Sequence, residues 1–357
     1  MTVFWLTLFT VFILSLMARY LAKPVPSGPG PVYIQPNRYY VFLVMAVLIL
    51  VSGLRSNIGD TFFYMYSYKL KPLTLADIGF SGDFGFNLLQ MLLQQFTADP
   101  QYLIFWVALF TNALIIPVLY KYSSLFELSV FLYITTGMYL TSMNGIRQFL
   151  AASIIFAATK YIFEGNWKKY FAGVLLASTI HQSALILIPV YFIVRQKAWT
   201  RQTLFLLLAA IFIVVGFNQF SHLLYSAIQD TRYSQYRNLE QHGANMMRAV
   251  VAAIPLILAY LGRERLRGIF PKSDYIVNMC LINLMVMMIS TQQWIFARFS
   301  FYFGLYELIL IPWLVKLFVP KDQKLIYYTI LISYFLYYFY ENVISLNIYY
   351  QSHFFKI

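Results

Sequence analysis

The chain has 357 residues, of which 61% are hydrophobic and only 11% charged, with a mean hydropathy of +0.66. Soluble globular domains carry roughly 25% charged residues, so this composition excludes a soluble fold and predicts a polytopic integral membrane protein. The net charge of +13 does not indicate nucleic-acid binding, because the basic residues lie in short segments between apolar runs, where they orient a chain in a membrane. The single cysteine, Cys280, excludes an intramolecular disulfide.

Thirteen hydrophobic segments predict an all-α transmembrane helical bundle that forms a single integral membrane domain over residues 1–357. They cover residues 3–20, 39–54, 84–97, 100–120, 125–142, 148–163, 170–181, 183–194, 203–225, 248–262, 275–291, 299–318 and 325–340. The segment at 84–97 is short and carries Asn87, Gln90 and Gln94 at helical spacing, so we expect it to lie at the membrane surface. Twelve membrane passes and one interfacial helix are therefore expected.

Two aspartates are expected to mark helix starts. Asp83 precedes the interfacial segment and is a candidate N-cap for it. Asp99 is followed by Pro100, a pair that predicts the cap and the first helical position of the next span.

The Lys and Arg residues are divided unequally between the two sides of the bundle. Seventeen of the 26 fall in short segments on one side, which the positive-inside rule makes cytoplasmic. The other nine are Arg55, Lys69, Lys71, Arg147, Arg232, Arg237, Arg248, Arg298 and Lys356. Both termini and the two longest loops, 55–99 and 226–247, are then outside a cell membrane that the chain crosses many times. Long loops are usually functional, so the working face is expected outside.

The segments at 170–181 and 183–194 are too short to cross a bilayer. Each has about 12 residues, or ~18 Å of helix, whereas the hydrocarbon core is ~30 Å thick. Non-helical polar backbone at such a depth is tolerated only inside protein or beside water. We therefore expect an outward-facing cavity with His181 near its floor.

Polar residues gather where spans meet the outer side. Arg55, Arg147 and Arg298, with Asn144 and Gln148, are the candidate substrate-binding residues. A guanidinium fork binds phosphate oxygens bidentately and keeps its charge, so this set predicts an anionic, phosphate-bearing substrate. Arginines at helix ends also extend to lipid headgroups, and that alternative stays open for each of the three.

Two residues on the same side are candidates for catalysis. Asp60 is suited to act as a general base or to orient an arginine, and it is equally suited to cap a helix after Gly59. His181 is suited to act as a base near neutral pH, or to bond the backbone at the broken turn. Glu307 lies in the middle of a span and ranks below Asp60.

Several motifs are missing from the sequence. It contains no phosphate-binding glycine loop, no HExxH motif, no Cys/His metal set and no Gly-x-Ser-x-Gly turn. We therefore expect no metal and no cofactor. A phosphate-handling membrane protein without a nucleotide site predicts a substrate that is activated elsewhere and delivered on a lipid.

At these junctions the chain resembles the EpsG family of Wzy-like exopolysaccharide polymerases from bacilli. The motif Asn144-Gly145-Ile146-Arg147-Gln148 carries part of the resemblance. The other matching segments are 51–55 with 59–60, 126–132, 165–171, 181–195 and 296–306. The resemblance runs over nearly the whole chain in order, whereas 61–83, 226–247 and the C-terminal tail match poorly.

The resemblance implies an enzyme that joins repeat units of exopolysaccharide on the outer face of the membrane. The growing chain is held on polyprenyl pyrophosphate, the leaving group, and the next lipid-linked oligosaccharide supplies an acceptor hydroxyl. The implied partners are these two substrates, the lipid bilayer, and other exopolysaccharide export and chain-length proteins. Related glycosyltransferases use an acidic residue in an outer loop, a role that Asp60 would match.

Three other functions remain open from the sequence. A flippase for lipid-linked units would explain the passes and the cavity, although no internal repeat is found and the polar residues gather on one side. A membrane acyltransferase could use His181 as its base but needs a cytoplasmic entry for acyl-CoA. A scaffold for other polysaccharide enzymes would not depend on Arg147.

Overall fold

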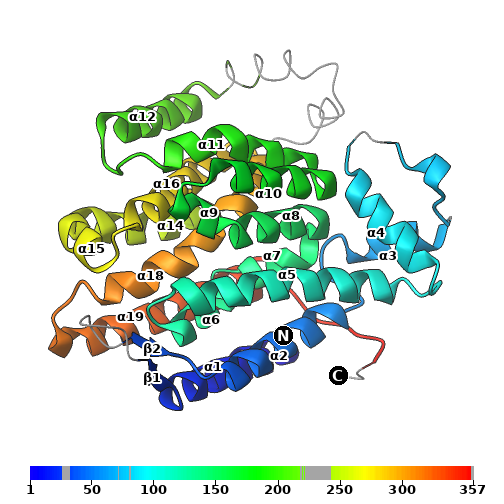
Figure 1. The fold of residues 1–357 in the computed structure, drawn as a ribbon, viewed down its shortest axis with the longest axis horizontal. Helices are drawn as coiled ribbons and strands as arrows, with labels where there is room; N and C mark the ends of the chain where they lie inside the picture. Colours follow the sequence, from blue (N-terminus) through cyan, green and yellow to red (C-terminus); the bar gives the residue numbers. More distant parts are fainter. Residues whose placement is uncertain are drawn as a thin grey trace. The chain divides into compact units, whose positions relative to one another are not determined.

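Each of the thirteen hydrophobic segments contains a helix in the computed structural model of the protein (Figure 1). The structure describes residues 1–25, 33–70, 72–79, 82–217, 219, 221 and 243–354. Of the two expected outer loops, the first falls almost entirely within these residues, whereas 226–242 of the second lies outside them. Contacts divide the chain into two compact units, residues 1–191 with 311–357 and residues 192–310.

The first unit is built almost entirely of helices. In chain order it contains α1 (Thr2–Tyr20), β1 (Lys23–Val25), β2 (Tyr33–Gln35), α2 (Arg38–Gly53), α3 (Thr61–Leu70), the 3-10 turn η1 (Leu75–Asp77), α4 (Phe84–Gln94), α5 (Gln101–Tyr122), α6 (Phe126–Thr135), α7 (Met138–Asn144), α8 (Ile146–Ala157), α9 (Thr159–Glu164), α10 (Trp167–Ile180), the 3-10 turn η2 (Gln182–Ile186), α19 (Pro320–Tyr338) and the π-helical turn η6 (Phe339–Ser345). The strands β1 and β2 pair antiparallel, with Pro24 opposite Ile34.

Every secondary-structure element that the structure describes in the second unit is a helix. It contains α12 (Arg201–Val215), α14 (Met246–Leu261), α15 (Arg263–Ile269), α16 (Ser273–Ser290), η4 (Trp294–Phe299), α17 (Ser300–Phe303) and η5 (Gly304–Tyr306). Two further helices, α11 (Leu187–Val194) and α18 (Glu307–Val315), contain the points at which the chain passes from one unit to the other.

Among the residues that the structure describes, five helical stretches are long and apolar enough to cross a membrane. They are Thr2–Tyr20, Gln101–Tyr122, Ile146–Glu164, Ser273–Ser290 and Trp294–Val315. The pair α14 and α15, bent by 83°, is a sixth candidate, and four apolar helices are shorter. The chain is thus a helical membrane protein, as its composition predicted.

Helix α6 forms the centre of the first unit. All ten of its residues are buried, as expected for a helix that is apolar on every side. It packs against α1 and α19, while α5 contacts both α2 and α8 (Figure 1). Helix α6 ends where Gly137 adopts a φ of +83°, a left-handed conformation that glycine adopts without steric cost. The expected span 125–142 is therefore two helices, α6 and α7.

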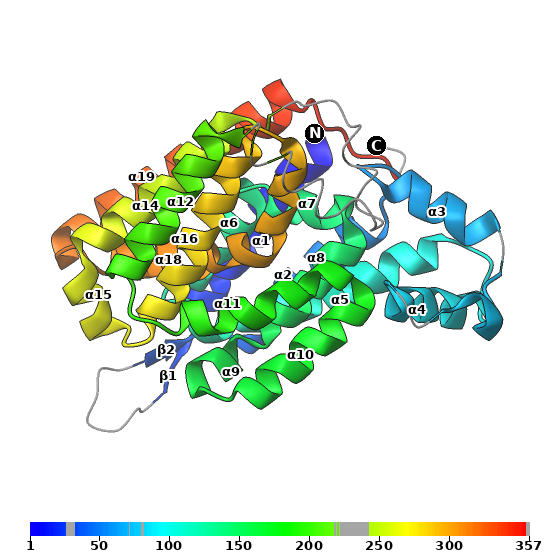
Figure 2. The same ribbon diagram turned by 90° about the horizontal axis from the view of Figure 1, so that it is seen from above.

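The expected interfacial helix is α4, and Gln94 of its polar stripe bonds to protein. Gln94 Nε2 donates to the Tyr68 carbonyl at 2.8 Å, and its Oε1 accepts from Leu73 N at 2.9 Å. Helix α4 also contacts α10 and α5 (Figure 2). Gln94 therefore holds the end of α3 and the loop that follows it, and helical spacing alone does not reveal these partners.

The two aspartates expected at helix starts behave differently. Asp99 Oδ1 accepts from Gln101 N at 2.9 Å and caps α5, which begins one residue after Pro100. Asp83 stands at the N-cap position of α4, but its side chain makes no capping hydrogen bond. Its carboxylate instead contacts two other segments of the first unit, described below.

Candidate functional site at the helix ends of the first unit

Arg55 follows the end of α2 and lies in the core, with only 1% of its surface exposed. It donates to the Ser52 carbonyl, to the Met143 carbonyl at 2.8 Å and to Thr61 Oγ1 at 3.0 Å. Burial lowers the pKa of its guanidinium to about 10, so the group stays charged at neutral pH. Arg55 was a candidate for binding phosphate, and in the structure its guanidinium joins α2, α3 and α7.

The C-terminal tail covers the same loop. Ser56 N donates to the Gln351 carbonyl at 2.9 Å, and Gln351 N donates to Asn57 Oδ1 at 2.8 Å. Ser352 Oγ donates to the Leu54 carbonyl at 2.6 Å. The backbone around Arg55 is therefore held on both sides.

Asp60 and Asn144, which are 84 residues apart in the chain, meet at the start of α3. Asn144 Oδ1 accepts from Asp60 N at 3.1 Å. A Cβ added to Gly59, whose φ is +52°, would lie 2.1 Å from that oxygen. The sequence Gly59-Asp60 is thus needed for the close approach of Asn144, which fixes the backbone that carries the Asp60 carboxylate.

Arg147 is the second residue of α8, and its side chain is 39% exposed. The guanidinium carbon lies 5.3 Å from the centre of the Tyr64 ring and 5.5 Å from that of Phe86. Nε donates to Tyr64 Oη at 3.3 Å, and Nη1 donates to Asp83 Oδ2 at 3.4 Å. Two ring faces and a carboxylate therefore orient a partly exposed cation.

Asp83 connects Arg147 to the break after α10. Its Oδ1 accepts from Gln182 N at 3.0 Å, and its side chain is only 10% exposed. The break comes at His181, whose extended backbone (φ −150°, ψ 115°) separates α10 from η2, as the two short segments predicted. One carboxylate thus joins the starts of α4 and α8 to this turn.

The His181 ring is held by Ser183. Ser183 N donates to His181 Nδ1 at 3.3 Å, and Ser183 Oγ lies 2.9 Å from the same nitrogen. Gln148 Nε2 donates to Ser183 Oγ at 3.5 Å. A ring nitrogen accepts a backbone N–H only when it is unprotonated, so the neutral imidazole carries its proton on Nε2.

A hydrophobic cluster supports this set of polar residues. Tyr68, Phe86, Leu103, Ile104, Val107, Ile146 and Leu150 form its buried centre. Tyr64 and Ile180 pack against it, so the residues that flank Arg147 and the His181 turn rest on the same apolar base. The site is therefore built on packed helix ends rather than on mobile loop tips.

The structure brings together most of the residues that the sequence singled out in the first unit. Asp60 meets Asn144, and Gln148 meets the His181 turn through Ser183. Tyr64 links the two groups, because its N–H donates to the Asp60 carbonyl and its hydroxyl accepts from Arg147. We call Asp60, Tyr64, Asp83, Arg147 and His181 the Arg147 site.

Asp83 is a member of the site for which the sequence indicates only a helix cap. The available signal was its place in an outer loop, directly before a helix with a polar stripe. Its contacts with Arg147 and Gln182 depend on three segments meeting in space.

Arg298 belongs to the second unit. It lies in η4, and its guanidinium carbon is 5.8 Å from the ring centre of Trp294. Within the same unit Asn283 Nδ2 donates to Glu307 Oε1 at 2.7 Å, so the mid-span carboxylate has a buried polar partner. Among the described residues no three His, Cys, Asp or Glu side chains are grouped to hold a metal.

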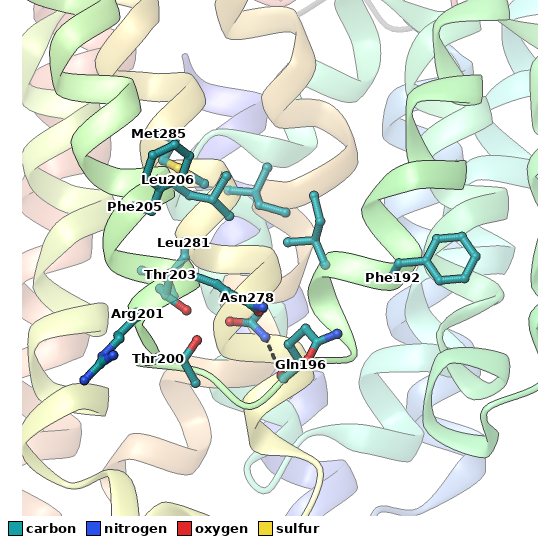
Figure 3. A pocket seen from close by; sticks show the side chains of 13 residues that line it. Phe192, Gln196, Thr200, Arg201, Thr203, Phe205, Leu206, Asn278, Leu281 and Met285 are labelled. Atoms are coloured by element: carbon teal, nitrogen blue, oxygen red, sulfur yellow. Dashed lines mark hydrogen bonds between the residues drawn. The ribbon is translucent and has the colours of Figure 1, made fainter.

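The second unit also contains a pocket of about 550 Å³ along α12 and α16 (Figure 3). Thr200, Thr203, Gln196 and Asn278 gather at one end, where Asn278 Nδ2 donates to the Gln196 carbonyl at 2.8 Å. Apolar side chains such as those of Phe205, Leu206 and Met285 line the other end. None of the residues that the sequence analysis selected lines this pocket.

The apolar helices and the Arg147 site define a polytopic helical membrane protein with a polar site at the ends of its helices. The chain belongs to the EpsG family, whose model matches residues 38–354, and the family is one of exopolysaccharide biosynthesis. Comparison with curated proteins finds no match, and comparison with solved structures finds none either.

Proposed function

We propose that the protein polymerises polyprenyl-pyrophosphate-linked oligosaccharide units into exopolysaccharide at the outer face of the cell membrane. The observation that carries this proposal is the setting of Arg147, a partly exposed guanidinium held between two aromatic faces and a carboxylate. A cation oriented in this way is suited to bind pyrophosphate, and the Tyr64 ring beside it is suited to stack on a sugar ring. Membership of the EpsG family supports the same assignment.

The proposed topology has twelve passes, with both termini outside. It puts the Arg147 site on the outer side, because the seventeen remaining basic residues orient the chain. The short helices on either side of His181 suit a cavity that opens on this side.

In the proposed reaction the acceptor oxygen bonds to the anomeric carbon of the growing chain while the bond from that carbon to the pyrophosphate oxygen breaks. Arg147 stabilises the negative charge that develops on the departing pyrophosphate. Asp60 takes the acceptor proton and releases it to water. Asp60 suits this role better than His181, because His181 Nδ1 already accepts from Ser183 N.

The other residues support this arrangement. His181 would donate its Nε2–H to a substrate oxygen, and Asn144 and Gln148 hold Asp60 and the His181 turn in place. Arg55 positions the loop between α2 and α3 without contacting substrate. The expectation that Arg298 also contacts the phosphates stays a prediction.

The decisive experiment places purified protein in liposomes with its lipid-pyrophosphate-linked repeat unit and no nucleotide or metal, and separates the products by size. A ladder of multiples of the unit that is lost in Arg147→Ala and kept in Lys69→Ala would support the proposal. Lys69 is a suitable control because it is an exposed basic residue at the end of α3, on the same expected side. Units that stay monomeric but change leaflet would instead identify a flippase.

A further inference from the structure

A basic pocket of about 470 Å³ lies in the first unit, away from the Arg147 site. It is bounded by α1, by the start of α6, by the residues after α18 and by the first turns of α19. Arg19, Lys316 and Lys324 bring positive charge to it. All three are among the basic residues that the positive-inside rule puts on the cytoplasmic side.

A buried carboxylate orients one of these cations. Arg19 forms an ion pair with Glu127 of α6, whose side chain is only 1% exposed, while 41% of the Arg19 side chain stays exposed. Three cations and one carboxylate leave a local charge of +2. Burial lowers the pKa of Lys316, and the nearby charge of Arg19 adds to this effect while Glu127 opposes it. A bound anion would therefore offset the repulsion between the positive charges that line the pocket.

The pocket also contains a hydroxyl group without a partner. Tyr327 lines the pocket, and its Oη is buried and makes no hydrogen bond to any described residue. Burying a hydroxyl without a hydrogen bond is unfavourable, so its presence beside three cations indicates a missing acceptor. An anionic oxygen would accept this hydrogen bond.

The rest of the lining is apolar. Phe12, Leu16 and Leu331 line the pocket farther along α1 and α19. Met17 and Leu325, on the same two helices, are exposed and suited to contact lipid. The charged part of the pocket thus continues into an apolar lining that fits hydrocarbon chains, which a free anion does not need.

We propose that this pocket binds the phosphate group of an anionic phospholipid of the cytoplasmic leaflet, with Arg19, Lys316, Lys324 and Tyr327 contacting the headgroup and Phe12, Leu16 and Leu331 contacting its acyl chains. Basic pockets between membrane helices on the cytoplasmic side bind such headgroups by charge and hydrogen bonding. The proposal does not rest on the polymerase reaction, because the site and its readout involve lipid binding alone.

The test is a titration of the full-length protein in neutral detergent, with bound lipids counted by native mass spectrometry. We expect phosphatidylglycerol to bind in preference to phosphatidylcholine. Lys316→Gln and Lys324→Gln should each weaken phosphatidylglycerol binding about fivefold, since one basic residue near an anionic headgroup contributes about 1 kcal/mol. Tyr327→Phe should weaken phosphatidylglycerol binding and leave phosphatidylcholine binding unchanged.

Lys321→Gln is the matched control, because Lys321 is exposed on the same helix and does not line the pocket. It should bind phosphatidylglycerol like the unchanged protein. Equal binding of the two lipids, or unchanged binding in Lys316→Gln and Lys324→Gln together, would overturn the proposal. Displacement of phosphatidylglycerol by millimolar inorganic phosphate would overturn the lipid assignment and identify a site for the free anion.

Discussion

Asp83 and Arg147 are 64 residues apart in the chain, yet Asp83 Oδ2 lies 3.4 Å from Arg147 Nη1. The other oxygen of the same carboxylate accepts from Gln182 N. The pair therefore joins the only expected interfacial helix to the turn that separates two short helices. The ion pair also orients the Arg147 guanidinium while leaving it partly exposed, and the proposed function depends on this partial exposure.

Arg147→Lys should lower activity and Arg55→Lys should lower stability, although each keeps a positive charge. Lys at 147 loses the planar fork, and we expect polymer synthesis to fall about 100-fold with little change in thermal unfolding. Lys at 55 cannot make the three separate hydrogen bonds of the buried guanidinium, and we expect a loss of about 2 kcal/mol of stability. Thermal unfolding and the product ladder are measured for both variants. If the two variants lost stability and polymer synthesis to the same extent, the different roles given to Arg55 and Arg147 would be contradicted.

Asp83→Asn should lower polymer synthesis about tenfold while leaving thermal unfolding almost unchanged, since an ion pair with one partly exposed partner contributes about 1 kcal/mol or less to stability. The amide oxygen can still accept from Gln182 N, whereas the charge that orients Arg147 is lost. Asp83→Ala removes both contacts and should lower activity further. Asp99→Asn is the control, because the Asp99 carboxylate caps α5. Full polymer synthesis by Asp83→Asn would show that Asp83 does not belong to the site.

Gly59→Ala should destabilise the protein by about 2 kcal/mol or more, because the residue has a positive φ and its new Cβ would meet Asn144 Oδ1 at 2.1 Å. The measurement is the midpoint of thermal unfolding. Gly268→Ala is the matched change, since a Cβ there meets nothing within 4 Å and its φ is not positive, and it should be neutral or slightly stabilising. A Gly59→Ala protein as stable as Gly268→Ala would show that the Asn144 contact does not form.

Arg298→Ala tests the remaining sequence prediction for the phosphate-binding set. If Arg298 contacts the pyrophosphate, the variant should lose polymer synthesis about as strongly as Arg147→Ala. Arg248→Ala is a suitable control, because Arg248 is another basic residue of the second unit on the same expected side. Normal polymer synthesis by Arg298→Ala would show that Arg298 does not contact the phosphates, and its contact with the Trp294 ring would then be structural.

The sequence alone determined the class of the protein and the positions of its long apolar helices, whereas α3 and α15 fall outside the predicted segments. Long apolar runs have few other stable structures, and the bilayer requires backbone hydrogen bonds to be satisfied within each segment. The break at His181 is expected from length, because two runs of about twelve residues are each too short to span the full thickness of the hydrocarbon core. The family could also be predicted from the sequence, because the motifs that carry the resemblance are short and continuous in the chain. The EpsG family model matches residues 38–354.

Tertiary structure decided what the polar residues at the helix ends do. Arg55 and Arg147 have the same charge and both lie at helix junctions, yet Arg55 is buried against carbonyl groups and Arg147 is partly exposed between aromatic rings. Asp83 was expected to cap its own helix, but its carboxylate instead reaches two segments far along the chain. Burial and long-range partners arise only when separate helices pack together, whereas spacing along one helix specifies nothing beyond that helix.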